Sequence, residues 1–306
     1  MDLASCSLNS VTVRAAPLPR LVTLATENGF GGIGLWRDSY ATIGATEAAR
    51  HTEGSGLRVT SVCRAGMFVQ PTERHRDANR ADNLRAIDEA HTLGAECLVL
   101  VCGGVRGRDL AGARTQIFDG IAGLIDIAAA AQVRLAVEPM HPMMAADRSA
   151  ITSLGEAVDL AEQFASPWVG VAVDTYHVWW DVRLPELMHR AGGNVFSVQL
   201  ADWVLPIHGQ LSSRGMPGEG HVDMTGFLDL CRRARYPGPI EVEVLSDRWW
   251  AIPADHVARA AAHALQRIHE PAQPGTTRGR PVNTRSPTLD RPEPVGPGRH
   301  PRPSSS

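Results

Sequence analysis

The sequence has few aromatic residues and few cysteines. Aromatic side chains make up 5% of its 306 residues, and its five cysteines are Cys6, Cys63, Cys97, Cys102 and Cys231. No two of them form a Cys-x-x-Cys pair and their number is odd, which argues against a disulfide framework and against a structural zinc site. We therefore expect a protein of the reducing cytoplasm.

The sequence also lacks long apolar runs and an excess of positive charge. No segment reaches the ~20 apolar residues that span a bilayer. Residues 1–10 contain no basic stretch that leads into an apolar one, so we expect no signal peptide. The formal net charge of −3 gives no reason to expect nucleic acid or an anionic membrane as a partner, and a small molecule is the expected ligand.

Residues 271–306 differ in composition from the rest of the chain. They contain no aromatic residue and are rich in Pro, Arg, Ser and Gly. Such a segment buries too little apolar surface to offset the entropy of ordering, so we expect a disordered tail. A docking arm for a partner is the alternative. Residues 1–270 then form one folded domain.

Eight β-type runs alternate with amphipathic helical runs over residues 1–270. This pattern is typical of βα units on a parallel sheet, and eight such units favour a closed barrel over an open sheet. The sequence therefore predicts an α/β fold of the (β/α)8 TIM barrel type. The predicted strands are 3–9, 31–36, 58–63, 97–103, 133–139, 169–177, 195–201 and 240–246.

Polar side chains occupy the last four predicted strands near their carboxyl ends. Glu138 follows the fifth apolar run, Asp174 the sixth, Gln199 lies in the seventh and Glu243 in the eighth. The carboxyl ends of barrel strands converge on one face, where the chemistry of this architecture is found. Three carboxylates at one point repel each other unless a cation lies between them. We therefore expect all four side chains to be ligands of a divalent metal.

Two of these ligands need a separate argument. An amide in a buried strand costs free energy without a partner, and a metal would accept the oxygen of Gln199. Glu241 and Glu243 face the same side of their strand, and Glu243 is the expected ligand because it lies nearer the rim. Four oxygen ligands favour Mn²⁺ or Mg²⁺, with Co²⁺ or Zn²⁺ as alternatives. If Gln199 were a core amide, His177 or His208 would complete the site.

Together these residues resemble the sugar phosphate isomerase and epimerase superfamily, which has a xylose isomerase-like barrel and includes ketose 3-epimerases and inosose dehydratases. That family has Glu after strand five, Asp-x-x-His after strand six, His after strand seven and Glu after strand eight. Gln199 stands where the usual His is expected. "SSRGMPGEGHVDMTGFLDL" is similar to the family's Arg-x-x-Pro-Gly-x-Gly-x-x-Asp segment, and "YPGPIEVEVLS" to its final strand.

The resemblance implies a reaction that begins with removal of a proton beside a carbonyl and passes through a metal-stabilised enediolate. The family's glutamates after strands five and eight exchange this proton from opposite faces, which implies Glu138 and Glu243 as the catalytic acid and base. His177 and Arg214 are the implied substrate-binding residues, with His141 as a further candidate. Family members often pair, so a homodimer is expected.

Six of the seven tryptophans follow predicted strand ends on the expected catalytic face. Indole rings there would form an apolar wall for a substrate, and Trp36 and Trp203 are the candidates for contact with it. The six are Trp36, Trp179, Trp180, Trp203, Trp249 and Trp250.

Three functions stay open from the sequence. The first is an isomerase or epimerase that acts on a sugar or a related hydroxy-carbonyl compound. The second is a lyase that expels water or another group from the same enediolate. The third is a barrel that binds a ligand without turnover. An endonuclease of the three-zinc type is disfavoured, because it needs more histidine ligands and a basic groove.

Overall fold

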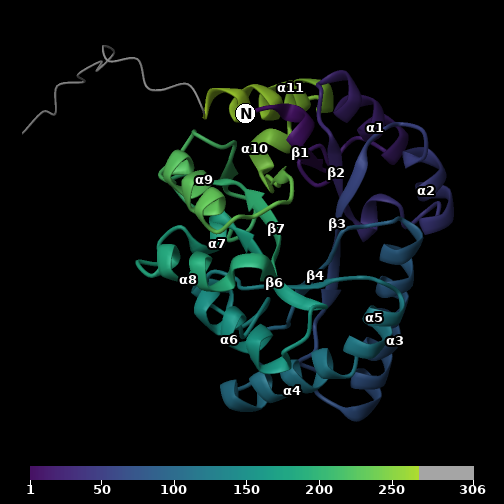
Figure 1. Cartoon of the computed structure of the whole chain (residues 1–306), viewed down its shortest axis with the longest axis vertical. Coiled ribbons are helices and arrows are strands. Elements are labelled where there is room, and N and C mark those ends of the chain that lie inside the picture. The colour runs from purple at the N-terminus through teal and green to yellow at the C-terminus, as the bar shows by residue number, and fades with distance from the viewer. Residues whose placement is uncertain (269–306) are drawn as a thin grey trace, which may run out of the picture. The chain divides into compact units, whose positions relative to one another are not determined.

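Eight parallel strands close into a barrel in the computed structural model, which describes residues 1–268 (Figure 1). Helices connect successive strands and surround the barrel, so the predicted TIM barrel is confirmed. The barrel strands are β1 (Cys6–Asn9), β2 (Gly32–Trp36), β3 (Arg58–Gly66), β4 (Leu98–Val101), β5 (Leu135–Glu138), β6 (Val169–Asp174), β7 (Val195–Leu200) and β10 (Ile240–Val242).

Several helices begin at polar caps that the sequence supplies. Ser153 accepts a hydrogen bond from the backbone N–H of Glu156, as its spacing predicts, and Asp223 accepts one from Gly226. The helices are α1 (Leu18–Glu27), α2 (Ala45–Thr52), α3 (Glu73–Thr92), α4 (Leu110–Ala122), α5 (Ile125–Ala130), α6 (Leu154–Phe164), α7 (Thr175–Val178), α8 (Leu184–Ala191), α9 (Met224–Arg233), α10 (Asp247–Trp250) and α11 (Ala254–Arg267).

Alternation along each strand separates two apolar cores and directs the acidic residues inward. Leu135 and Val137 of β5 belong to the large cluster that packs with the helices. Ala136, between them, belongs to a small separate cluster inside the barrel. Because side chains alternate with a period of two, Glu138 faces the interior with Ala136. The other buried members of the interior cluster are Cys63, Cys97, Val99, Ala172 and Phe196.

Seven of the eight predicted strands are longer than the observed ones, and in the first and the sixth a helix replaces part of the predicted strand. Leu3–Ser5 form a 3-10 helix, η1, ahead of β1. β6 ends at Asp174 rather than at residue 177, and α7 follows at once. The cause is local, since one carboxylate oxygen of Asp174 accepts a hydrogen bond from the backbone N–H of Tyr176 at 2.9 Å and so caps that helix.

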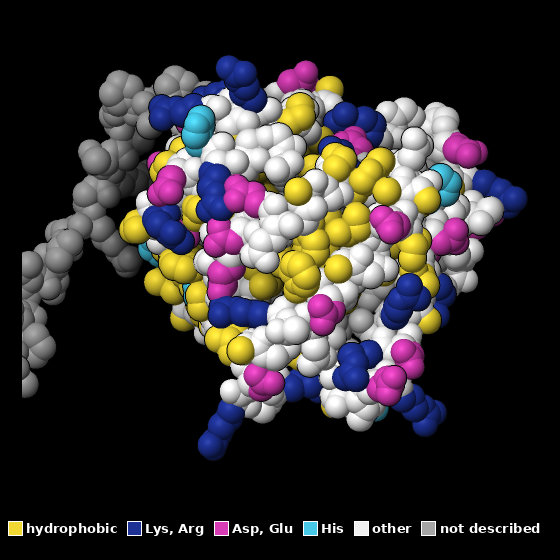
Figure 2. Space-filling view, turned by 60° about the horizontal axis from the view of Figure 1, so that its bottom comes forward, with side chains coloured by type: hydrophobic (Ala, Val, Ile, Leu, Met, Phe, Trp, Pro, Cys, Tyr) yellow, Lys and Arg dark blue, Asp and Glu magenta, His cyan; other side chains and the backbone are white. Residues whose placement is uncertain are grey.

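The predicted disordered tail, 271–306, lies outside the described residues. Within residues 1–268, no helix is long and apolar enough to cross a membrane. Acidic and basic side chains are interspersed on the face in Figure 2, around a patch of hydrophobic side chains.

Candidate active site

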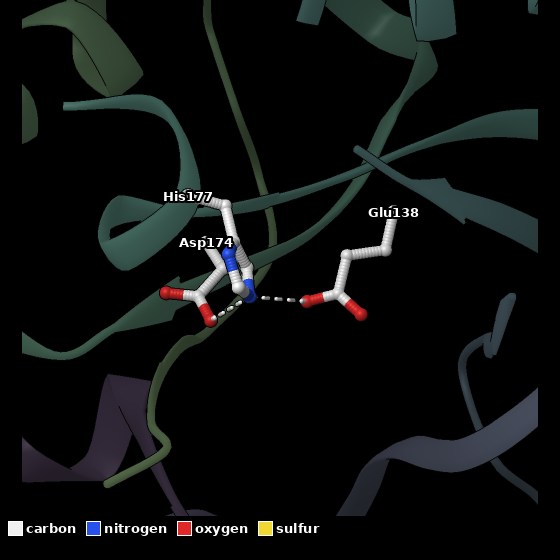
Figure 3. A group of neighbouring side chains, drawn as sticks. All are labelled: Glu138, Asp174 and His177. Carbon is white, nitrogen blue, oxygen red and sulfur yellow. Dashed lines mark ion pairs between the residues drawn. The ribbon is translucent and has the colours of Figure 1, made fainter. Parts of the chain in front are cut away.

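Glu138, Asp174 and His177 meet at the carboxyl end of the barrel (Figure 3). Glu138 is the last residue of β5, Asp174 is the last of β6, and His177 lies one helical turn beyond Asp174. His177 Nε2 is 3.7 Å from an oxygen of Asp174 and 4.0 Å from an oxygen of Glu138. All three side chains are buried, and one potential ligand atom from each lies within 4.8 Å of the others.

Arg214 connects this group to Glu243. Its Nη1 donates to Asp174 Oδ2 at 2.6 Å and to Glu243 Oε2 at 3.3 Å. Its guanidinium lies over the Tyr176 ring, 4.7 Å from the ring centroid. Arg214 is therefore buried among these side chains, although its Nε has no hydrogen-bond partner among the described residues, and five of the predicted site residues form one cluster.

A short two-stranded sheet outside the barrel carries Arg214 into this cluster. β8 (Asp202–Trp203) pairs antiparallel with β9 (Arg214–Gly215), an element that the sequence did not predict. Asp202 accepts hydrogen bonds from the backbone N–H groups of Gly218 at 2.8 Å and Val222 at 3.0 Å. A carboxylate at the exit of β7 thus holds the loop that carries the arginine.

Gln199 lies between Asp174 and Glu241, because it is in register with both. Its Nε2 donates to Glu241 Oε1 at 3.2 Å. Its Oε1 is buried and has no hydrogen-bond partner among the described residues. A buried acceptor without a partner costs about 1–3 kcal/mol, and a cation at the cluster would remove that cost.

Glu241 lies one inward position below Glu243 and is satisfied by neutral donors. It accepts hydrogen bonds from Thr60 Oγ1 at 2.8 Å, Ser61 Oγ at 2.9 Å and Asn9 Nδ2 at 2.6 Å. Asn9 Nδ2 is also 3.3 Å from Glu243 Oε1 and so links the two glutamates. The sequence analysis missed Asn9, although it is an inward polar residue at the end of β1.

Gly34 makes room for this buried carboxylate. A Cβ atom at Gly34 would collide with the carboxylate of Glu241, so any other residue there would displace it. The glycine of β2 therefore sets where Glu241 sits, and through it where the amide of Gln199 points.

Both ring nitrogens of His177 face N–H donors. The backbone N–H of His141 donates to His177 Nδ1 at 3.1 Å, and Arg214 Nη2 lies 3.2 Å from Nε2. Burial, together with the charges of Arg214 and His141, lowers the pKa of His177 well below its usual value, so the ring is neutral. A neutral ring carries one hydrogen and accepts from only one of these two donors, and Nε2 is the nitrogen that faces the acidic cluster.

With this geometry established, the chain can be compared with known proteins. The model of the xylose isomerase-like TIM barrel family matches residues 22–268. The chain belongs to that family. A crystal structure of a protein from Sinorhizobium meliloti 1021 matches with a TM-score of 0.84 and 40% identity, and the match covers 87% of this chain and 99% of that one.

Two curated relatives of this barrel are enzymes with different reactions. An L-ribulose-5-phosphate 3-epimerase of Escherichia coli O1:K1 is 27% identical over 214 residues, which cover 67% of this chain and 71% of the epimerase. A 3-dehydroshikimate dehydratase of Pseudomonas putida is 27% identical over 269 residues, which cover 83% of this chain but only 40% of the dehydratase. The family thus includes both epimerases and a dehydratase.

Burial and mutual repulsion destabilise the charged forms of the carboxylates at this site. Burial raises the pKa of Glu138 well above its usual value, and the charges of Glu243 and Asp174 raise it further. Burial also raises the pKa of Glu243 to about 7, with Arg214 opposing the shift. With all three carboxylates ionised, they and the guanidinium would carry a net charge of −2, which a divalent ion would balance. The donor set and the unpartnered Gln199 oxygen therefore fit such an ion.

Aromatic side chains border the cluster that Arg214 forms with the site carboxylates. Trp36 Nε1 donates to Glu243 Oε1 at 2.8 Å. The Trp203 ring lies 5.0 Å from that of His141 and 4.8 Å from that of Tyr176, measured between centroids. The predicted contact residues Trp36, Trp203 and His141 thus lie next to the cluster, whereas His208 is exposed.

Proposed function

We propose that this barrel is a divalent-metal-dependent isomerase or epimerase acting on a sugar or a related hydroxy-carbonyl compound. One observation carries the proposal. Buried carboxylates at the ends of β5 and β6 lie close to each other and to His177, and Arg214 links Glu243 to them. Gln199, in register with Asp174, has an amide oxygen that lacks a partner among the described residues. Crowded buried carboxylates raise the free energy of the metal-free protein, and binding of a cation would remove their repulsion.

The proposed metal ligands are Glu138, Asp174, Gln199 and Glu243. All four offer oxygen, so Mn²⁺ or Mg²⁺ is preferred over Zn²⁺. When bound, the ion would polarise the substrate carbonyl and lower the energy of the enediolate.

Glu138 and Glu243 are the proposed acid and base. In the barrel their strands are separated by β6 and β7, so the two carboxylates approach a bound substrate from different sides. Glu138 accepts no hydrogen bond from any described residue, so its lone pairs are available for a substrate proton. Glu243 is held by Trp36 and Arg214 and would return a proton to the other side.

His177, Arg214 and the aromatic border would orient the substrate. His177 Nε2 lies 3.7 Å from Asp174 and 3.2 Å from Arg214 Nη2, where it would contact a substrate oxygen. Arg214 would stabilise negative charge on a neighbouring oxygen. Trp36, Trp203 and His141 would exclude water from this side.

A lyase is the second candidate. The similarity to the dehydratase spans 83% of this chain, more than the similarity to the epimerase does. Both reactions begin with the same proton removal and differ in whether the enediolate takes a proton or loses a group. A barrel that binds ligand without turnover is the third candidate, and it gives no reason for carboxylates as crowded as these.

The test is metal analysis of the purified protein followed by NMR in deuterated water. We expect about one Mn²⁺ or Mg²⁺ per chain after incubation with these ions, and loss of that metal in Glu138→Gln. L-Ribulose 5-phosphate and 3-dehydroshikimate are the first substrates to try. Deuterium in an isomer of the substrate supports an epimerase, and a product lighter by one water supports a lyase. A protein that holds no divalent metal overturns the proposal.

We also propose a cytoplasmic homodimer. All five cysteines are free and buried, which suits a reducing compartment. Light scattering during size-exclusion chromatography tests the dimer, and a monomer mass at micromolar concentration would contradict it.

A further inference from the structure

A cavity of about 1120 Å³ opens beside the candidate site, over the carboxyl ends of β1, β2 and β3. Its lining includes Trp36, whose indole donates to Glu243. It also includes Cys63, whose pKa is raised by burial and by the charges of Glu243 and Glu138, while Arg64 lowers it. The cavity therefore begins next to a proposed catalytic carboxylate and extends away from it.

Four arginines line this cavity: Arg14, Arg37, Arg64 and Arg148. Arg37 is neutralised, because it pairs with Asp82 at 3.1 Å and with Glu89 at 2.7 Å. The only other acidic residue of the lining is the exposed Asp38.

The other three arginines keep most of their hydrogen-bonding capacity. Arg64 makes no ion pair with any described residue, and Arg148 pairs only with its neighbour Asp147, at 3.4 Å. Arg14 lies over the ring of Trp250, 4.8 Å from its centroid, an arrangement that leaves its N–H edge open. The four arginines of the lining exceed its three carboxylates, Asp38, Asp82 and Glu89, by one positive charge.

We propose that Arg14, Arg64 and Arg148 form a subsite for an anionic group, a phosphate or a carboxylate, at the end of the substrate remote from the reacting carbon. Guanidinium groups bind such anions through paired N–H donors. The assignment of this anion to a substrate rests on the proposed function, whereas the binding of an anion does not.

The size and place of the cavity fit this assignment. Ligand pockets commonly have volumes of roughly 300–1,000 Å³, so this cavity admits a molecule of sugar phosphate size. Trp36 lines the cavity and contacts Glu243, and therefore lies between the anion subsite and the proposed acid–base pair. A substrate with an anionic end would bridge the two.

Isothermal titration with inorganic phosphate and, separately, acetate tests the subsite in the metal-loaded protein and after EDTA treatment. The variant is Arg64→Gln/Arg148→Gln, and the control is Arg232→Gln/Arg259→Gln, which removes the same charge from exposed positions on other helices. We expect binding in the wild type and the control, and at least tenfold weaker binding in the cavity variant, with or without metal.

Tighter binding of phosphate than of acetate identifies a phosphate ester as the substrate class, and the reverse identifies a carboxylate. The subsite is disproved if neither anion binds, or if the cavity variant binds as well as the control. Because the measurement needs neither turnover nor metal, its failure leaves the proposed function standing, and loss of the metal site leaves the subsite standing.

Discussion

The backbone N–H of His141 donates to Nδ1 of His177 at 3.1 Å, and this single bond decides which nitrogen faces the acidic cluster. The loop after β5 thus fixes the orientation of a side chain that follows β6. A histidine within 4 Å of two carboxylates looks like a metal ligand by distance alone. Arg214 Nη2 lies 3.2 Å from the same nitrogen, so His177 has two alternative roles, as a metal ligand or as a residue that contacts Arg214 and the substrate.

Replacing His177 by Asn separates these two roles. Asn keeps an acceptor for the backbone of His141 but has no group in the place of Nε2. We expect kcat/KM to fall by about 10²-fold or more, as for other donors to a developing oxyanion, while metal content stays at the wild-type level. Metal content measured alongside kinetics checks this. Loss of the metal in His177→Asn would instead make His177 a ligand.

The raised pKa of Glu138 predicts how the stability of the metal-free protein depends on pH. The folded state holds this proton more tightly than the unfolded state, so the free energy of unfolding falls as the pH rises above the usual glutamate value of 4.5. Glu138→Gln removes the buried charge. In EDTA we expect the variant to be more stable than wild type at pH 8, with the difference shrinking towards pH 5.

Urea denaturation at both pH values measures this difference. Glu186→Gln, a substitution in the first turn of α8, serves as a control for the loss of one negative charge. Equal effects of the two substitutions at pH 8 would show that the Glu138 carboxylate is not strained in the folded protein.

The amide oxygen of Gln199 should contribute to metal affinity and to metal preference. Gln199→Leu removes the oxygen at similar volume, and we expect the Kd for Mn²⁺ to rise at least tenfold, or about 1.4 kcal/mol. Gln199→His supplies a nitrogen instead and should shift the preference from Mn²⁺ towards Zn²⁺. Competition with a chromogenic chelator measures both. Unchanged affinity in Gln199→Leu would show that the amide is not a ligand.

Glu241 should act on the metal only through Gln199 and Asn9. Glu241→Gln keeps an acceptor for both amides but removes the negative charge that orients them. We expect a 10–100-fold rise in the metal Kd and a loss of about 1–2 kcal/mol in unfolding free energy. Ser61→Ala removes a donor to the same carboxylate and should lower stability with little change in Kd. Equal changes in Kd for the two variants would make the role of Glu241 purely structural.

The strand pattern predicted the barrel and the inward acids because both follow from local rules. Alternating apolar residues put Glu138 inside with Ala136, and strand order then brought it to Asp174. The burial of Arg214 could not be predicted from strand alternation, because it depends on the antiparallel pairing of β8 with β9. The orientation of the His177 ring likewise depends on a contact with the backbone N–H of His141.

The cavity arginines were likewise not predicted as a site from the sequence. Arg64 sits in an apolar strand, in "SVCRAG", where an unpaired charge is a signal that sequence reading could have used. Arg14 and Arg148 are distant in sequence and come together only through closure of the barrel.

Asp202 connects the surface segment between β7 and α9 to the barrel centre. Its carboxylate holds the amides of Gly218 and Val222, and the same segment delivers the one guanidinium that offsets the charge of Asp174 and Glu243. If this loop opened, Arg214 would leave the site, and the carboxylates of Asp174 and Glu243 would repel each other. We therefore expect amide hydrogen exchange at Gly218 and Val222 to depend on ion occupancy, so that this surface loop would report the charge balance at the barrel centre.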